Sequence, residues 1–114
     1  MIAVIFEVLP HPEHRQAYLG IAADLKPLLV DMDGFISIER FQSLSNPDKI
    51  LSLSFWRDED AVKQWRNVEA HRAAQSMGRK NIFSDYRLRI ASVIRDYGLN
   101  EREQAPVDSR TAHE

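Results

Sequence analysis

The chain has 114 residues, of which 44% are hydrophobic, and its 15 Lys and Arg against 17 Asp and Glu leave a formal net charge of -2. This length and composition fit one compact domain. The near-neutral charge gives no electrostatic case for a nucleic-acid or anionic-membrane partner, and the lack of cysteine excludes disulfides, thiolate metal sites and cysteine nucleophiles. The longest apolar runs are only strand-length and no signal peptide is recognisable, so we expect a cytoplasmic protein.

The first 30 residues predict a buried strand followed by a helix. Residues 2–9 (IAVIFEVL) are apolar on both alternating faces, which is typical of a central strand that is covered on both sides. Pro10 and Pro12 mark a turn, after which apolar residues at helical spacing predict a helix over residues 13–30. Pro27 is expected to kink this helix or to end its regular part.

A hairpin is expected next. After the turn sequence DMDG, residues 35–42 (FISIERFQ) alternate in the manner of an edge strand with one mixed face. The two predicted faces carry Phe35, Ser37, Glu39 and Phe41 on one side, and Ile36, Ile38 and Arg40 on the other. The loop SLSNPD has a length that suits a hairpin and leads into a third strand over residues 50–56 (ILSLSFW).

A second helix follows at once, because the acidic residues 58–60 suit the positive N-terminal end of a helix. Asn67 is a strong N-cap residue, so it predicts a break and two shorter helices in tandem. Residues 86–97 (YRLRIASVIRDY) alternate as a long fourth strand. Residues 98–114 are polar and have no periodicity, so this tail is expected to be disordered or to form an arm on another subunit.

The order strand, helix, strand, strand, helix, strand predicts an α+β fold. With right-handed crossovers it gives the ferredoxin-like βαββαβ arrangement, a four-stranded antiparallel sheet with strands 2–9 and 50–56 in its centre. Helices cover only one face of such a sheet. Because strand 2–9 is apolar on both faces, the second face must be buried too, and we expect a homodimer that packs sheet against sheet.

A set of residues around the third strand points to a known family. Gly34-Phe35 opens the second strand, and Phe55-Trp56 is followed by an acidic turn and then by Ala61, Trp65 and His71. In these features and in the order of elements, residues 1–97 resemble the antibiotic biosynthesis monooxygenase (ABM) family of the dimeric alpha-beta barrel superfamily. The resemblance implies a dimeric alpha-beta barrel. Members include cofactor-independent oxygenases of quinols and polyketide phenols, haem-degrading enzymes and proteins of no assigned activity, so the fold alone selects no reaction.

The haem-degrading branch of this family can be compared residue by residue. Its members carry an Asn on the first strand, a Trp on the second helix and a haem-ligating His ten residues after that Trp. Trp65 matches, whereas the Asn position falls on Phe6 and the His position on Gln75. The resemblance therefore does not imply haem degradation by that mechanism, because the iron ligand and the amide are both missing. Haem ligation by His71 in a shifted geometry is the less favoured alternative.

A cofactor-independent monooxygenase needs only a dry pocket, a base and a cation or donor around a small aromatic phenol or quinol. His71 is the predicted base near neutral pH, with Trp65 and Gln75 as further candidate catalytic residues. On a helix Gln75 lies near His71 while Trp65 points well away, unless a break at Asn67 realigns the two halves. The candidate substrate-binding residues, which supply aromatic walls and cations, are Phe6, Arg40, Phe55, Trp56 and Arg72. No metal site and no tightly held cofactor are expected.

Each candidate residue also has a structural interpretation. Trp56 and Trp65 can anchor the core, His71 can be a solvated helix residue, and Asn67 can be a helix cap. The alternative function is therefore a non-catalytic, dimeric ligand-binding or stress-related protein. In that protein the same cavity holds a ligand or is filled by Trp65 and its neighbours.

Overall fold

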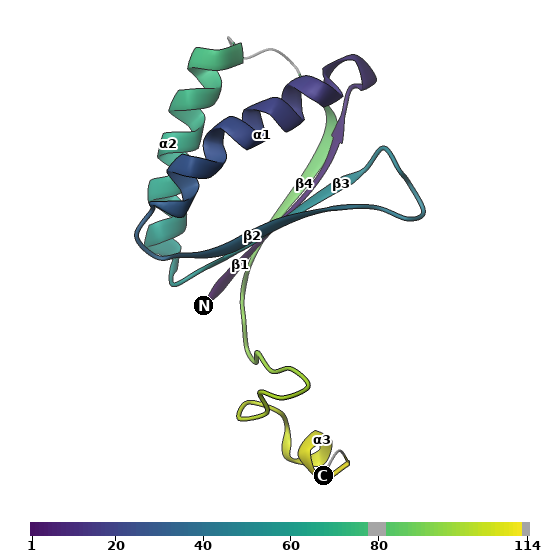
Figure 1. Ribbon diagram of the computed structural model, residues 1–114, viewed down its shortest axis with the longest axis vertical. Coiled ribbons are helices and arrows are strands. Elements are labelled where there is room, and N and C mark those ends of the chain that lie inside the picture. The colour runs from purple at the N-terminus through teal and green to yellow at the C-terminus, as the bar shows by residue number, and fades with distance from the viewer. Residues whose placement is uncertain (78–81, 113–114) are drawn as a thin grey trace.

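The computed structural model describes residues 1–77 and 82–112, without the side chains of residues 70–77 and 110–112. It consists of one sheet, two long helices and a C-terminal segment that extends away from the body (Figure 1). The elements in chain order are β1 (Ile2–Pro10), η1 (Pro12–His14), α1 (Arg15–Val30), β2 (Phe35–Gln42), β3 (Ile50–Trp56), α2 (Glu59–Met77), β4 (Phe83–Ser92) and α3 (Val107–Ala112).

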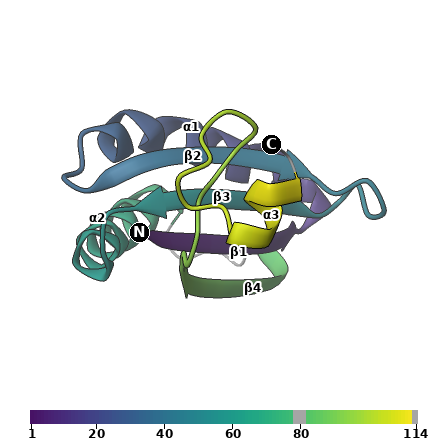
Figure 2. The same cartoon turned by 90° about the horizontal axis from the view of Figure 1, so that it is seen from below.

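The sheet confirms the predicted topology. Its strand order is β2-β3-β1-β4 and each neighbouring pair is antiparallel, so β1 and β3 are the central strands. Figures 1 and 2 together show α1 and α2 on the same side of the sheet. This is the α+β, ferredoxin-like arrangement that the order of elements predicted. Pro27 does not end α1, because the helix continues to Val30.

Strand register fixes which residues face the helices. In β1, Val4 lies opposite Ser54 of β3 and Ile90 of β4. Residues two apart along a strand share a face, so β3 turns its even-numbered residues from Ile50 to Trp56 toward the helices, and these are the buried ones. The other face of the sheet, here called the open face, carries the apolar residues Ala3, Ile5, Leu51, Leu53 and Phe55.

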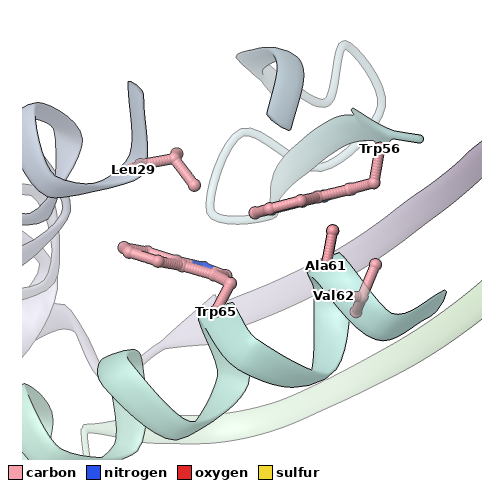
Figure 3. Close-up of a cluster of buried hydrophobic side chains, with 5 residues drawn as sticks. All are labelled: Leu29, Trp56, Ala61, Val62 and Trp65. Carbon is pink, nitrogen blue, oxygen red and sulfur yellow. The ribbon is translucent and has the colours of Figure 1, made fainter. Parts of the chain in front are cut away.

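The core between the helices and the sheet is centred on Trp56, which is only 1% exposed. Figure 3 shows its indole among the other buried side chains of the cluster: Leu29, Ala61, Val62 and Trp65. These residues come from α1, β3 and α2, so the cluster ties both helices to the sheet. It therefore fixes the position of α2, on which half of the predicted site residues lie.

The turn before β2 is packed directly against the start of α2. Gly34 has a φ of +88°, and a Cβ at this position would lie 2.6 Å from the Cβ of Ala61. The carbonyl of Gly34 accepts a hydrogen bond from the backbone N–H of Arg57 at 2.7 Å. Asp58 caps the helix, since its Oδ1 accepts the backbone N–H of Ala61 at 2.9 Å. Only glycine satisfies both the backbone conformation and the close approach.

Two predictions about the second half of the domain are wrong. α2 is continuous over Glu59–Met77, so no new helix begins at Asn67. Val68 packs against the core cluster, and this tertiary packing outweighs the capping preference of the residue before it. β4 spans Phe83–Ser92 rather than 86–97, because its partner β1 begins at Ile2, which lies opposite Ser92.

A bulge in β2 changes the predicted faces of that strand. Phe35 pairs with Trp56, whereas Ser37 already pairs with the residue before Trp56, so Ile36 is an extra residue. Phe35 therefore faces the helices, on the same side as Arg40, and its ring meets that of Trp56 edge-on with centroids 5.3 Å apart. The prediction that Phe35 shares a face with Ser37 is wrong, because strict alternation does not hold across a bulge.

The C-terminal segment leaves the sheet after β4. The N–H of Val93 still donates to the carbonyl of Met1 at 3.0 Å, and the chain then turns several times before α3. Figure 2 shows this segment in front of the open face of the sheet. Ile94 and Leu99 within it are 86% and 89% exposed. Disorder or contact with another subunit, the two expectations for residues 98–114, stay predictions.

Candidate functional site

A pocket of about 130 Å³ lies between α2 and the helix-facing side of the sheet. Its floor is formed by Val4 and Phe6 of β1, Ser54 and Trp56 of β3, and Leu88 and Ile90 of β4. The lining residues from α2 are Val62, Trp65, Arg66 and Glu69. The pocket is thus mainly apolar and aromatic, with a few polar groups that converge on it, which is the usual make-up of a small-molecule site.

Trp56 closes the inner end of the pocket. Its indole N–H donates to the Oγ of Ser54 at 2.9 Å, and both residues are buried. This bond satisfies the one polar atom of a large buried ring. Trp56 is therefore mainly a core residue, although it also lines the pocket.

Trp65 lies between the core and the pocket, and it is 9% exposed. Its indole N–H donates to the Oε2 of Glu69 at 3.2 Å, one turn further along α2. Residues four apart on a helix are neighbours on its surface, so the continuous helix holds this pair together. The bond fixes the carboxyl of Glu69 beside the aromatic wall.

Opposing influences act on the Glu69 carboxyl. Burial raises the pKa of Glu69 above its ordinary value of 4.5, although the hydrogen bond from Trp65 and the charge of Arg40 both favour the ionised form. Glu69 lines the pocket and is also exposed, which places it at the pocket mouth. Water there moderates the upward shift but leaves a carboxyl that gains a proton more readily than an ordinary glutamate.

Arg40 approaches the same carboxyl from β2. It lies opposite Ser52, which in turn lies opposite Phe6, so its side chain belongs to the helix-facing side of the sheet. Its Nε is buried and has no hydrogen-bond partner among the described residues. Arg40 does not line the pocket floor, but its charge reaches Glu69. A cation is therefore present on the β2 side of the pocket.

Phe6 forms the other end of the aromatic wall. Its ring lies 5.8 Å from that of Phe83 and 5.7 Å from that of Tyr86, measured between centroids. Phe83 also contacts Tyr18 of α1 at 5.6 Å. The packing of these aromatic rings holds the Phe6 side chain in place at the pocket, so Phe6 forms a rigid apolar wall.

The structure brings three of the predicted site residues together and separates one. Trp65, Trp56 and Phe6 line the pocket, and Arg40 lies beside it. Phe55 lies on the open face, because alternation along β3 turns it away from Trp56, so the expectation that it forms part of the same aromatic wall is wrong.

The remaining predicted residues, His71, Arg72 and Gln75, lie in α2, but their side chains are outside the described residues. The realignment of Trp65 with His71 that a break at Asn67 would give does not occur, since the helix is uninterrupted.

Sequence reasoning missed Glu69 and Ser54. The four-residue spacing between Trp65 and Glu69 was a local signal that these side chains would meet on one helix face. The local signal for Ser54 was weaker. Ser54 precedes Trp56 by two residues in a strand, so the two side chains share a face of the sheet. The approach of Arg40 depends on strand pairing across β3, which no local pattern reveals.

Two further properties of the described chain bear on function. The residues that the structure describes contain no group of three or more His, Cys, Asp or Glu side chains placed to hold a metal ion. Within the same residues, no helix is both long enough and apolar enough to cross a membrane.

Comparison with known proteins decides the family. The model of the family described as "Antibiotic biosynthesis monooxygenase" matches residues 1–77, which span β1 to the end of α2. The chain belongs to the antibiotic biosynthesis monooxygenase family. The residues on which the resemblance was recognised, from Gly34 to His71, all lie inside the matched region of this ABM protein.

One relative of this ABM chain is the jasmonate monooxygenase ABM of Pyricularia oryzae. The two are 46% identical over 111 residues, which cover 96% of this chain and 52% of that protein. The chain thus spans about half the length of this relative.

Two solved structures share the fold. Rv0793 from Mycobacterium tuberculosis matches with a TM-score of 0.72 at 15% identity. The matched region covers 85% of this chain and 98% of the Rv0793 chain. A MhuD mutant with two manganese protoporphyrin IX molecules per active site has a TM-score of 0.69 at 14% identity, covering 86% and 99%. At such identities the likeness shows the fold alone.

Proposed function

We propose that this ABM-family protein is a monooxygenase that oxidises a small, mainly apolar substrate in the pocket beneath α2, without a tightly held cofactor. The observation that supports the proposal is the pocket itself. Trp56, Trp65 and Phe6 wall a space into which a single described carboxyl, that of Glu69, is held by a hydrogen bond. Such a site can bind a flat apolar ring and act on one ionisable group of it.

An electron-rich phenol or quinol is the substrate class whose oxidation needs the fewest catalytic groups from the protein. Loss of the phenolic proton gives an anion that can pass electrons to oxygen, and a dry pocket keeps this anion from side reactions. Where the substrate carries an activated methylene group, one molecule of oxygen converts the CH2 group to a carbonyl and yields one molecule of water. The atoms and electrons of this reaction balance without any external reductant.

The residues present suit this chemistry. Trp65 and Phe6 would stack on the substrate ring, and Arg40 would balance negative charge that develops on its oxygen. His71 is the base predicted from the sequence, with Gln75 and Arg72 as possible donors to the same oxygen. Substrate-binding roles for Trp56 are secondary, because its indole N–H is already paired with Ser54.

Haem is not proposed as the cofactor. Phe6 stands where the haem-degrading relatives are expected to carry an Asn, and its ring is packed against Phe83 and Tyr86. A packed phenyl ring offers no hydrogen bond to a group bound on iron. The residues present therefore do not fit haem-based chemistry of that kind.

A carboxylic acid of the jasmonate type is the second candidate substrate. It is favoured by the relative named jasmonate monooxygenase, which is 46% identical to this chain. Jasmonate joins a largely hydrocarbon skeleton to one carboxylate, and the pocket combines apolar walls with Arg66 at its lining and Arg40 beside it. Hydroxylation of a saturated carbon needs two further electrons, so this candidate requires a reduced flavin or nicotinamide as co-substrate.

We also propose that the protein is a homodimer that packs through the open face of its sheet. Ile5, Leu53 and Phe55 are only half-buried there, and an apolar sheet face of this kind needs a cover. Glu7 lies on the same face, but it is neutralised by Lys49 at 3.0 Å and by Arg89 at 2.5 Å. Its charge therefore opposes the burial of this face less than an unpaired carboxylate would.

Oxygen consumption by the purified, metal-free protein tests the proposed activity. The substrates are hydroquinones, polycyclic phenols with an activated methylene group, and jasmonic acid, each with and without NADPH or reduced flavin. We expect turnover of a phenol without reductant, and slower turnover in Trp65→Phe, because Trp65 lines the pocket. No turnover of any substrate under either condition would reject the proposal and favour the non-catalytic ligand-binding protein.

A further inference from the structure

The Glu69 carboxyl is held in one orientation by a hydrogen bond, which is not needed for a glutamate on a helix surface. The N–H of Trp65 donates to its Oε2 at 3.2 Å, and this bond leaves Oε1 without a described donor. The two α2 residues that contribute charge to the described lining are Glu69 and Arg66. Glu69 is thus the acidic group of the described pocket lining, and one positioning contact already orients it.

Arg40 supplies the matching cation from the opposite layer. Its position in β2, opposite Ser52, turns it toward the helices, and its charge acts on Glu69. The buried Nε of Arg40 has no acceptor among the described residues. Leaving a buried N–H without an acceptor is unfavourable, so an acceptor oxygen beside this donor would stabilise it.

We infer that Glu69 is the base that removes the substrate's acidic proton, and that Arg40 balances the anion that results. The inference rests on the proposed function. In this step the O–H bond of the substrate breaks, a new O–H bond forms on Oε1 of Glu69, and the electron pair stays on the substrate oxygen. Arg40 thereby exchanges one negative neighbour, the carboxylate, for another, the substrate oxyanion, so the net charge of the site is unchanged.

The surroundings of Glu69 favour this role. The strands beneath it present apolar or neutral side chains, and its charged neighbours among the described residues are Arg40 from β2 and Arg66 from α2. Burial raises the pKa of Glu69, the direction that makes a carboxylate a better base near neutral pH. Trp65 has two roles in this scheme, since it stacks on the substrate ring and also positions Glu69 through its hydrogen bond.

The pH dependence of kcat/KM distinguishes Glu69 from His71 as the base. The wild type is expected to lose activity on the acid side as Glu69 gains a proton. Glu69→Gln should lower kcat/KM by about 10² to 10⁴-fold and should remove this acid limb. The matched control is Glu59→Gln, because Glu59 is an exposed glutamate at the start of the same helix. This substitution should leave the pH profile unchanged. An acid limb that persists in Glu69→Gln but vanishes in His71→Ala would overturn the inference while leaving the proposed function intact.

A second test needs no turnover. The ionised form of 4-nitrophenol absorbs visible light, so its ionisation in the bound state can be read directly, while quenching of Trp56 and Trp65 reports binding. We expect bound nitrophenol to ionise at lower pH than free nitrophenol. In Arg40→Met the ratio of ionised to neutral bound phenol should fall about tenfold, since the variant lacks the positive charge that stabilises the anion.

Lys26→Met is the control for this test, because Lys26 is an exposed cation on α1 and does not line the pocket. An unchanged ratio in Arg40→Met, an equal fall in Lys26→Met, or no binding of nitrophenol would each overturn the assignment of Arg40. A fall in Arg40→Met would support that assignment even in a protein that turns over none of the oxygenase substrates.

Discussion

The rings of Trp56 and Trp65 lie 6.4 Å apart with 30° between their planes, yet their N–H groups point to different partners. Trp56 donates to Ser54 inside the core, whereas Trp65 donates to Glu69 at the pocket mouth. One indole therefore holds the helix to the sheet, and the other borders the space for a ligand.

This difference predicts unequal effects of conservative substitutions. Trp56→Phe should lower the free energy of unfolding by about 2–3 kcal/mol, because it leaves a cavity in a packed core and removes the partner of Ser54. Trp65→Phe should cost about 1 kcal/mol, since its N–H lies at the pocket. Urea denaturation followed by circular dichroism measures both values. A larger loss in Trp65→Phe would contradict the assignment of Trp56 as the core residue.

Gly34→Ala should destabilise the protein by at least about 2 kcal/mol. The substitution forces an L-residue to a positive φ and places a Cβ 2.6 Å from that of Ala61. Gly20→Ala is the matched control, because Gly20 lies inside α1 and a Cβ there would meet nothing within 4 Å. It should stabilise the protein by about 0.5–1 kcal/mol. Equal effects of the two substitutions in urea denaturation would disprove the close approach of the turn to α2.

The pH dependence of stability should change in Glu69→Gln. Because the folded state raises the pKa of Glu69 above 4.5, its contribution to stability is fully present below that pH and is lost as pH rises through the folded pKa. The variant has no such loss, so its free energy of unfolding should improve relative to wild type between about pH 4 and pH 7. Urea titrations across this range measure the difference. A difference that does not vary with pH would show that Glu69 titrates normally.

Leu53→Arg should convert the proposed dimer to a monomer, since it places a charge in the centre of the open face. Leu44→Arg provides the control. Leu44 is 101% exposed in the hairpin loop and should tolerate the same change. Light scattering at micromolar concentration measures the mass of each protein. A monomeric wild type, or a Leu53→Arg variant that still has dimer mass, would rule out this interface.

Much of the fold could be predicted because its signals are local. The all-apolar pattern of residues 2–9 marked a central strand, and the acidic run at 58–60 marked the start of α2. The errors arose where contacts with a distant part of the chain determine the local secondary structure. The ends of β4 depend on where β1 begins, and helical continuity at Asn67 depends on the packing of Val68 in the core.

The candidate site was predictable in part for the same reason. Trp65, Trp56 and Phe6 were found because aromatic residues on a helix and on central strands meet in this kind of fold. Glu69 was missed because a glutamate in a charged helical stretch has the composition of a solvated surface. Phe55 was misplaced because adjacent aromatic residues in a strand point to opposite faces.

Leu88 and Ile90 line the pocket and yet are 47% and 43% exposed. They belong to β4, an edge strand that has only β1 as a neighbour. Among the described residues the pocket is therefore accessible along this edge, so a ligand can approach Trp65 without separating α1 from α2. For the proposed activity, the bound substrate itself would have to displace water along this edge, because the described residues leave it accessible.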